Sequence, residues 1–207
     1  MSEGAATLHA LVLAAGASRR FGSIKPLARY GGQPMLQLAV SRASEAVGAV
    51  WVVLGAHAAE LAPLLRHSGA TVLINRHWQE GLASSIRAGI ARLPASCGGV
   101  LLALADQPRV TAEDFRRLAA AWLRQPESIV AARHGSVTGA PAILPRCLFS
   151  DLGQLRGDTG ARRLIERYAS RTVCVPMPSA SFDVDTPEDL AALSALAAAD
   201  ERQAPGP

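Results

Sequence analysis

The residues best suited to chemistry lie between Leu11 and Lys25, in the stretch LVLAAGASRRFGSIK. A short apolar run at 11–13 predicts a buried strand that ends in small residues. Small residues let the backbone approach a ligand and point its N–H groups at an anion, and Arg19 and Lys25 add positive charge beside them. The stretch therefore predicts a strand that ends in a cradle for a polyphosphate.

Lys25 is the only lysine in the chain, and the other 20 basic residues are arginines. An ammonium is a compact point charge, whereas a guanidinium is a planar fork, so the two are not interchangeable at a ligand. A chance surface lysine is the alternative. Its position in a glycine-containing loop favours a role in contacting phosphate.

The spacing of this loop differs from the two commonest phosphate-binding motifs. The interval from Gly16 to Gly22 is one residue too long for G-x-x-x-x-G-K-[ST], Lys25 comes too late, and G-x-G-x-x-G is absent. The stretch resembles (L)-x-A-[AG]-G-x-S-x-R-x-G-x-x-K, the signature of Rossmann-like nucleotidyltransferases that activate sugars, isoprenoid precursors and molybdopterin. The matching positions are Leu13, Ala15, Gly16, Ser18, Arg19, Gly22 and Lys25, and Ala14 lies among them.

Acidic residues in two later segments could hold a divalent cation. Asp106 ends the apolar run 100–105, where a carboxylate at the mouth of a parallel sheet could bind Mg²⁺. An ordinary helix-capping Asp is the alternative. Asp183 and Asp185 alternate along an extended segment and share a face, so either could be the second ligand, and we favour Asp185. Asp189 is better explained as a carboxylate at a helix N-terminus.

Three glycine-containing segments could contact the rest of a substrate. The segment 80–86 places hydroxyl groups after a Gly turn at a helix start, which suits either ligand binding or simple capping. The segment 138–141 is a Gly/Pro turn into a strand, and 155–162 is a Gly-rich loop that leads into a helix. The candidate residues are Gly81, Ser84 and Ser85 for the nucleotide, and Gly139, Pro141, Gly157, Asp158, Gly160 and Arg162 for the second substrate.

Together these motifs resemble the molybdenum cofactor cytidylyltransferases over about residues 11–190. The shared elements are A-A-G-x-S-x-R-x-G, G-L-x-x-S-I, D-Q-P, G-x-P, G-D-x-G-A-R and D-V-D-T-P-E-D-L. The resemblance implies Mg²⁺ bound by Asp106 and Asp185, with Arg19 and Lys25 as further catalytic residues. Guanylyltransferase relatives read A-G-G where this chain has Ala15, so Ala15 favours CTP.

The reaction implied by the resemblance moves CMP from CTP to the terminal phosphate of molybdopterin and releases pyrophosphate. A molybdenum hydroxylase or its maturation chaperone is the implied protein partner. Three alternatives stay open: a GTP-dependent guanylyltransferase, transfer to another small phosphate such as a sugar, isoprenoid or lactyl phosphate, and a non-catalytic molybdopterin carrier or insertion chaperone. Both candidate metal carboxylates and the whole phosphate loop argue against a pure carrier.

Composition excludes several other classes of protein. The chain has 207 residues, of which 49% are hydrophobic and 18% charged, as in globular domains. The net charge of +4 comes without a basic run, and aromatic residues are only 4%, so neither nucleic-acid binding nor a membrane span is expected. An odd number of cysteines, Cys97, Cys147 and Cys174, and no signal-peptide pattern predict the cytoplasm.

The elements that must position these residues alternate between apolar strands and helical patterns. We expect strands at 50–54, 71–74, 100–105, 128–132, 140–144 and 171–176 after the first, with helices at 34–46, 58–66, 84–92, 160–168 and beyond Thr111 and Thr186. Continuous apolar strands predict a mostly parallel α/β sheet of the Rossmann-like nucleotidyltransferase type, covered on both faces. We expect a single domain over 1–207, with a core at about 8–199 and a flexible tail at 200–207.

Overall fold

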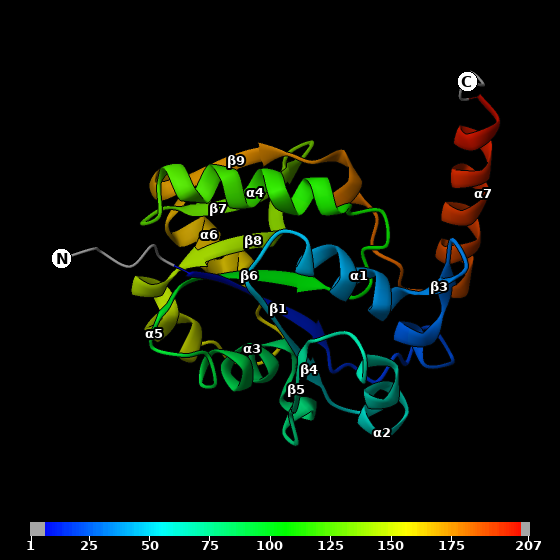
Figure 1. Ribbon diagram of the computed structural model, residues 1–207, viewed down its shortest axis with the longest axis horizontal. Coiled ribbons are helices and arrows are strands. Elements are labelled where there is room, and N and C mark those ends of the chain that lie inside the picture. Colours follow the sequence, from blue (N-terminus) through cyan, green and yellow to red (C-terminus); the bar gives the residue numbers. More distant parts are fainter. Residues whose placement is uncertain (1–6, 204–207) are drawn as a thin grey trace.

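The computed structural model describes residues 7–203, and within them the chain forms a seven-stranded sheet between two layers of helices (Figure 1). The strands are β1 (Thr7–Ala14), β4 (Ala49–Leu54), β5 (Thr71–Ile74), β6 (Cys97–Leu104), β7 (Ile129–His134), β8 (Val137–Pro145) and β9 (Thr172–Pro176). Their order is β5-β4-β1-β6-β8-β7-β9. Only β8 runs antiparallel to its neighbours, so the predicted mostly parallel α/β sheet is confirmed.

The helices are α1 (Met35–Ser44), α2 (Ala58–Leu61), α3 (Leu82–Ile90), α4 (Ala112–Arg124), α5 (Phe149–Gly153), α6 (Arg162–Arg167) and α7 (Pro187–Gln203). Short 3₁₀ turns and a two-stranded ribbon of β2 (Arg29–Tyr30) and β3 (Gln33–Pro34) complete the described chain. The predicted helix 58–66 divides into α2 and a 3₁₀ turn at Ala62–Leu65, because Pro63 supplies no N–H to continue an α-helix. No helix among residues 7–203 is both long and apolar enough to cross a membrane.

Four of the helices differ from the sequence prediction at their ends, and α1 is shorter than the expected 34–46. α3 begins at Leu82, two residues early, because Gly81 has a φ of 94° and marks its start. α6 covers only 162–167 of the expected 160–168. α7 continues to Gln203, so the part of the expected tail at 200–203 is helical, and 204–207 lie outside the described residues.

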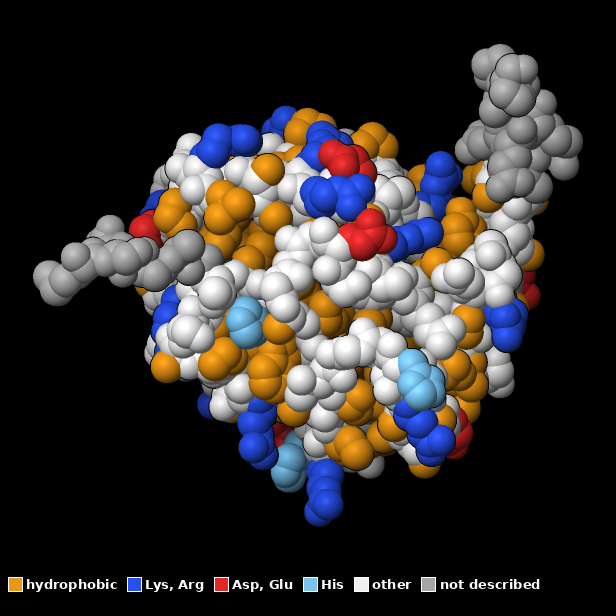
Figure 2. Space-filling model, viewed as in Figure 1, with side chains coloured by type: hydrophobic (Ala, Val, Ile, Leu, Met, Phe, Trp, Pro, Cys, Tyr) orange, Lys and Arg blue, Asp and Glu red, His pale blue; other side chains and the backbone are white. Residues whose placement is uncertain are grey.

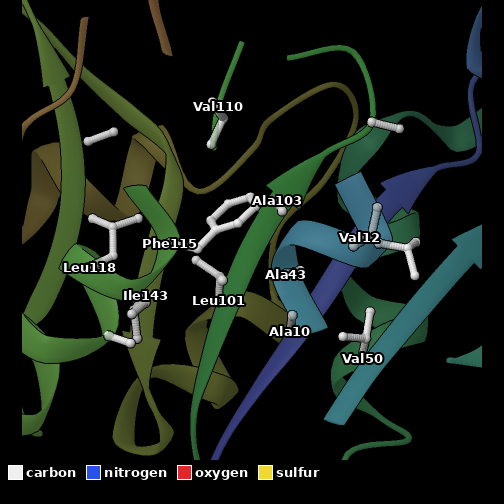
Figure 3. Close-up of a cluster of buried hydrophobic side chains, with 14 of the residues drawn as sticks. Ala10, Val12, Ala43, Val50, Leu101, Ala103, Val110, Phe115, Leu118 and Ile143 are labelled. Atoms are coloured by element: carbon white, nitrogen blue, oxygen red, sulfur yellow. The ribbon is translucent and has the colours of Figure 1, made fainter. Parts of the chain in front are cut away.

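One face of the sheet carries α1, α2 and α4, and the other carries α3, α5 and α6. The side chains of β1 alternate between the two faces, with Ala10 and Val12 on the first and Leu11 and Leu13 on the second. Figure 3 shows part of the first core, where Phe115 and Leu118 of α4 point toward β6 and β8. Both faces of the central strands are therefore buried, which explains why these strands are almost continuously apolar.

The N-terminus of α4 confirms the predicted cap. The Thr111 hydroxyl accepts from the Asp114 backbone N–H at 3.1 Å, and the Asp114 carboxylate accepts from the Thr111 N–H at 3.0 Å. This capping box satisfies two N–H groups that the helix itself leaves free. It also directs Phe115, Leu118 and Trp122 onto the sheet, as their spacing predicts.

His9 makes the stability of the fold sensitive to mild acid. Its Nδ1 accepts a hydrogen bond from Trp51 Nε1 at 3.1 Å, and burial lowers the pKa of His9 below its ordinary 6.5. The unfolded chain therefore binds a proton before the folded protein does, and the stabilisation from neutral His9 is lost as pH falls below about 6.5. We expect the melting temperature of the wild type to fall more steeply than that of His9→Gln between pH 7.5 and 5.5. Equal slopes would contradict this.

Candidate active site

The candidate site lies where β1 and β6, adjacent parallel strands, both end. Their carboxyl ends are joined by a hydrogen bond from the Ala105 N–H to the Leu13 carbonyl at 3.3 Å. A cavity of about 570 Å³ opens there, a size suited to a nucleotide-like ligand. Its walls include these predicted residues: Leu13, Ala14, Ala15, Gly16, Ser18, Arg19, Lys25, Gly81, Ser85, Asp106, Asp158 and Asp185.

The loop after β1 is folded into a compact turn by Ser18. This residue has a φ of 53°, and its carbonyl accepts from the N–H groups of Phe21 and Gly22 at 3.0 and 3.3 Å. Its hydroxyl accepts from the Lys25 N–H at 3.1 Å. Ser18 thus fixes the backbone on both sides of the arginines, and Gly22, with a φ of 74° and no place in the cavity wall, closes the turn.

Phe21 anchors the same loop, and the sequence reasoning missed it. The side chain is only 7% exposed and packs with Met35, Val184 and Leu193. Val184 adjoins Asp185, so this small apolar cluster joins the phosphate loop to the segment that carries the second carboxylate. A large apolar residue inside a loop of Gly, Ser and Arg is the signal that could have indicated the anchor.

Lys25 connects the two predicted metal carboxylates. Its Nζ lies 2.6 Å from Asp106 Oδ2 and 3.4 Å from Asp185 Oδ1, and Arg20 Nη1 lies 2.9 Å from Asp185 Oδ2. The three side chains of this cluster, Asp106, Lys25 and Asp185, come from segments that are far apart in sequence. The structure thus brings the three selected residues together at one end of the cavity, with Arg20 from the same phosphate loop beside them.

Asp185 is held by its own backbone neighbours. The Val184 N–H donates to the Asp106 carbonyl at 2.9 Å, and the N–H groups of Asp185 and Thr186 donate to Asp189 Oδ2 at 3.0 and 2.8 Å. These two hydrogen bonds lower the pKa of Asp189 below its ordinary value. Asp189 is therefore the helix-terminal carboxylate that its position predicts, and it orients the segment before α7.

Asp183, the alternative second ligand, takes a different position. Gln107 Nε2 donates to Asp183 Oδ1 at 2.9 Å and to the Ala140 carbonyl at 3.3 Å. Burial raises the pKa of Asp183, the nearby charges of Asp106 and Asp185 raise it further, and the Gln107 hydrogen bond opposes them. Asp183 is absent from the cavity wall, so the geometry favours Asp185 as the partner of Asp106.

The donor set fits a magnesium ion. Asp106 Oδ1 is buried and has no hydrogen-bond partner within residues 7–203, which leaves an acceptor oxygen beside the cavity. The described residues contain no group of three or more His, Cys, Asp or Glu side chains suited to a metal. Magnesium needs few protein ligands, because it is commonly held by one or two carboxylates together with substrate phosphates and water.

The loop 155–162 packs directly on the start of α3. The Ala83 N–H donates to the Gly157 carbonyl at 3.0 Å. A Cβ on Gly81 would lie 2.5 Å from Asp158 Oδ1 and from the Gly157 backbone, so glycine is required there. Asp158 is thereby brought to the cavity wall, whereas Gly157 contacts α3 behind it.

The two serines of α3 have different surroundings. Ser84 and Ser85 are 2% and 3% exposed, and both hydroxyls accept from Asn75 Nδ2, at 2.8 and 3.1 Å. Ser84 also donates to the Gly81 carbonyl at 2.8 Å and does not line the cavity, whereas Ser85 does. Contact between Ser84 and a nucleotide stays a prediction. Asn75, which follows β5, was missed, although a polar residue at the end of a parallel strand is a recognisable signal.

Five predicted second-substrate residues lie outside this cavity, among them Gly157, which contacts α3. Gly139 and Pro141 are in β8, next to the Ala140 carbonyl that Gln107 contacts. Gly160 packs near Leu82. Arg162 pairs with Glu166 at 2.9 Å and borders a separate cavity of about 220 Å³ beside β8 and β9. Their contact with a second substrate stays a prediction.

Trp78 and Gln79 line the main cavity, and the sequence reasoning did not select them. They belong to a 3₁₀ turn at Trp78–Glu80, just before Gly81. Gly55 makes their placement possible, because a Cβ there would lie 2.7 Å from Trp78 Cβ and closer still to the Ala15 carbonyl oxygen. Gly55 therefore lies between Trp78 and Ala15, and its lack of a side chain lets the 3₁₀ turn pack closely on the end of β1.

A substitution at Gly16 tests whether the loop after β1 binds a nucleotide, with little expected effect on the stability of the fold. A Cβ at Gly16 would meet no atom within 4 Å, and its φ lies outside the left-handed region. We expect Gly16→Ala to change the free energy of unfolding by less than about 0.5 kcal/mol. Its added methyl group would obstruct a phosphate held by the backbone, so we expect nucleotide affinity to fall about tenfold, or about 1.4 kcal/mol.

Titration calorimetry with CTP and Mg²⁺, beside a thermal melt, measures both effects. Gly153→Ala is the matched control, since Gly153 also has no atom within 4 Å of the added Cβ and lies in α5, outside the cavity wall. Equal nucleotide affinity in Gly16→Ala and wild type would show that no ligand backbone contact exists at this position.

Two curated proteins are similar to this chain in sequence. The chain is 29% identical over 195 residues to nicotine blue oxidoreductase of Paenarthrobacter nicotinovorans, which covers 87% of this chain and 93% of that protein. It is 35% identical over 114 residues to the bifunctional protein GlmU of Gluconobacter oxydans (strain 621H), covering 54% of this chain. The chain spans about a quarter of the length of GlmU, since the match covers 24% of it.

Solved structures and a family model extend the comparison. The crystal structure of Rv0371c from Mycobacterium tuberculosis H37Rv superimposes with a TM-score of 0.79 and 28% identity, covering 92% of this chain and 99% of that one. Residues 10–172 match the family model described as the MobA-like NTP transferase domain. Asp185 lies beyond the matched range, so its assignment depends on the geometry above. Because residues 10–172 make up most of the 207, the chain belongs to the MobA-like NTP transferase family and is a nucleotidyltransferase.

Proposed function

We propose that the protein transfers CMP from CTP to the terminal phosphate of molybdopterin and releases pyrophosphate, as a step in the maturation of molybdenum hydroxylases. The observation that carries this proposal is the cluster of Asp106, Lys25 and Asp185 at the end of a phosphate cradle. Paired carboxylates beside a polyphosphate site are the arrangement that phosphoryl-transfer chemistry needs.

In the proposed reaction an oxygen of the molybdopterin phosphate attacks the α-phosphorus of CTP. A new P–O bond forms there, and the bond from the α-phosphorus to the bridging oxygen of pyrophosphate breaks. The nucleophile is already an anion, so no general base is required. The main obstacle is the repulsion between two anions, which the site must offset.

The residues of the cradle have separable roles in this scheme. The backbone N–H groups at 16–18 and the side chains of Arg19 and Lys25 hold the β- and γ-phosphates and stabilise the leaving pyrophosphate. Removing one such preorganised donor costs about 3–4 kcal/mol of transition-state stabilisation in comparable sites. Asp106 and Asp185 would hold Mg²⁺, which would neutralise negative charge on the phosphates.

The wall formed by Ala15, Trp78 and Ser85 is the proposed position of the nucleotide base. Ala15 is 7% exposed, and its carbonyl accepts from the Ala56 N–H at 3.1 Å, so its methyl group has a fixed position. Guanylyltransferase relatives have Gly at this position in the resemblance described above. The extra methyl group supports a pyrimidine base, and CTP is therefore the proposed donor.

Two alternatives remain testable beside this proposal. The first is an oxidoreductase activity, which the name of the Paenarthrobacter relative suggests. The second is a carrier that binds molybdopterin without catalysing a reaction. The cradle and the paired carboxylates favour nucleotidyl transfer over both. Basic side chains on the face in Figure 2 lie in separate places with acidic ones near them, which supports a small-molecule substrate over nucleic acid.

Pyrophosphate release with CTP and with GTP, in the presence of Mg²⁺ and molybdopterin, is the experiment that tests the proposal. Release with CTP alone is the expected result. Release with GTP alone would keep the reaction type and overturn the argument from Ala15. No release with either, despite tight molybdopterin binding, would favour the carrier.

A further inference from the structure

Lys25 occupies the space between the two candidate metal carboxylates, where it contacts one oxygen of each and leaves Asp106 Oδ1 without a partner among the described residues. Its ammonium lies 2.6 Å from Asp106 Oδ2 and 3.4 Å from Asp185 Oδ1, and its side chain is only 16% exposed. An ammonium and a divalent cation cannot both occupy the space between these two oxygens. A cation that bridges Asp106 Oδ2 and Asp185 Oδ1 therefore requires the Lys25 ammonium to move.

The local charge balance opposes a divalent cation that arrives alone. The carboxylates of Asp106 and Asp185 already face two cations, Lys25 and Arg20, and Asp183 is the third carboxylate of this surrounding. A divalent ion would add an excess of positive charge in a partly buried place, where charges are weakly screened. A nucleotide triphosphate brings several negative charges and removes this excess.

The backbone at Lys25 is held where its side chain can serve either ligand. The Lys25 N–H donates to the Ser18 hydroxyl at 3.1 Å, which fixes the residue at the edge of the cradle. Both Lys25 and the cradle residues 16–19 line one cavity. Rotation of the flexible four-carbon stem is enough to move the ammonium from the carboxylates toward bound phosphates, with no change in the backbone.

We infer that Lys25 exchanges partners during binding, so that a divalent cation and a nucleotide bind with positive coupling and the cation alone binds weakly. This inference depends on the proposed nucleotidyl transfer at the same site. Lys25 acts as a placeholder for the cation until the triphosphate draws it away. Because coupling is reciprocal, the cation must raise nucleotide affinity by the same factor that the nucleotide raises cation affinity.

Binding of Mn²⁺ measured by electron paramagnetic resonance, with and without CTP and without an acceptor, tests the inference without turnover. For the wild type we expect CTP to tighten Mn²⁺ binding roughly 5- to 150-fold. In Lys25→Met we expect Mn²⁺ alone to bind more tightly than it does to the wild type, and the effect of CTP to shrink. A residue that merely supports the site would produce the opposite change in the affinity for Mn²⁺ alone.

Arg66→Met is the matched control, because it removes an exposed cation that does not line the cavity. It should leave Mn²⁺ affinity and coupling unchanged. Weaker binding of Mn²⁺ alone in a folded Lys25→Met would overturn the inference. If that variant does not fold, equal Mn²⁺ affinity of the wild type with and without CTP would overturn it.

The result also separates this inference from the proposed function. Mn²⁺ that binds together with CTP but shows no coupling through Lys25 would overturn the partner exchange and leave nucleotidyl transfer standing. Absence of Mn²⁺ binding in every protein with CTP and with GTP would overturn both.

Discussion

Asp106→Asn is expected to lower kcat/KM for nucleotidyl transfer roughly 10²- to 10³-fold while the protein stays folded. The substitution keeps the shape of the side chain but removes the charge that faces Lys25 Nζ at 2.6 Å. The backbone of the turn is unaffected, because the Asp106 carbonyl still accepts from the Val184 N–H at 2.9 Å. Steady-state pyrophosphate release and a thermal melt measure the two parts of the prediction.

Asp185→Asn and Asp183→Asn form a matched pair of controls. Asp185 lines the cavity and pairs with Lys25, so its substitution should produce a loss similar to that of Asp106→Asn. Asp183 faces Gln107 instead, and the amide oxygen introduced by Asp183→Asn can still accept that hydrogen bond, so the loss should be under about tenfold. A larger loss from Asp183→Asn than from Asp185→Asn would reverse the assignment of the second metal ligand.

Trp122→Ala is expected to lower the free energy of unfolding by about 3–5 kcal/mol, the largest stability effect that we predict. Trp122 is fully buried at 0% exposure and lies against β6, the strand that ends before Asp106. The contact is close, since a Cβ on Gly99 would lie 2.6 Å from Trp122 Cζ2. Truncation would leave a cavity between α4 and the sheet. Urea unfolding followed by circular dichroism measures the loss.

Trp122→Phe distinguishes loss of packing from loss of the indole N–H. The Nε1 atom of Trp122 is buried and has no hydrogen-bond partner in the described part of the chain, so its removal should carry no hydrogen-bond cost. We expect Trp122→Phe to lose clearly less stability than Trp122→Ala. Equal losses would show that the six-membered ring of phenylalanine cannot restore the packing against Gly99.

The cradle and the carboxylates could be predicted from the sequence because their signals are local. The end of β1 is identified by an apolar strand that is followed by small residues and then by Arg19 and Lys25. The end of β6 is identified by the apolar run before Asp106. Both strands are parallel and adjacent, so the two signals meet at one edge of the sheet. The Thr111 capping box was predictable for the same reason, since its partners lie three residues apart.

The reversed strand β8 could not be predicted, because its direction depends on pairing with strands distant in sequence. The segment 138–141 contains Gly139 and Pro141, which suggested a turn before the strand. In the structure β8 begins at Val137, and a register shift between Ala131 and Ala132 of β7 accommodates these residues opposite it. The Gly and Pro residues identify an irregular segment. They do not show that this segment lies inside a strand that continues to pair with β7.

The surroundings of Ser84 and Arg162 could not be predicted from the sequence either. Hydroxyl groups at a helix start can face a ligand or form hydrogen bonds with buried polar groups. Ser84 does the second, because its hydroxyl accepts from Asn75, nine residues earlier. Arg162 follows the Gly-rich loop, but the loop packs on α3 and the helix α6 then carries Arg162 to another cavity. Such choices depend on how separate segments pack, which spacing along the chain does not encode.

The link between Lys25 and Asp185 has a consequence for synthesis on the ribosome, because the two residues are 160 positions apart. At an elongation rate of about 5–20 residues per second, the cradle is made roughly 10–30 s before the second carboxylate. During that interval a nascent chain carries only part of the candidate site, with Lys25 and Asp106 already made and Asp185 still to come. The candidate site is therefore completed late in translation, long after the strands β1 and β6 that it adjoins.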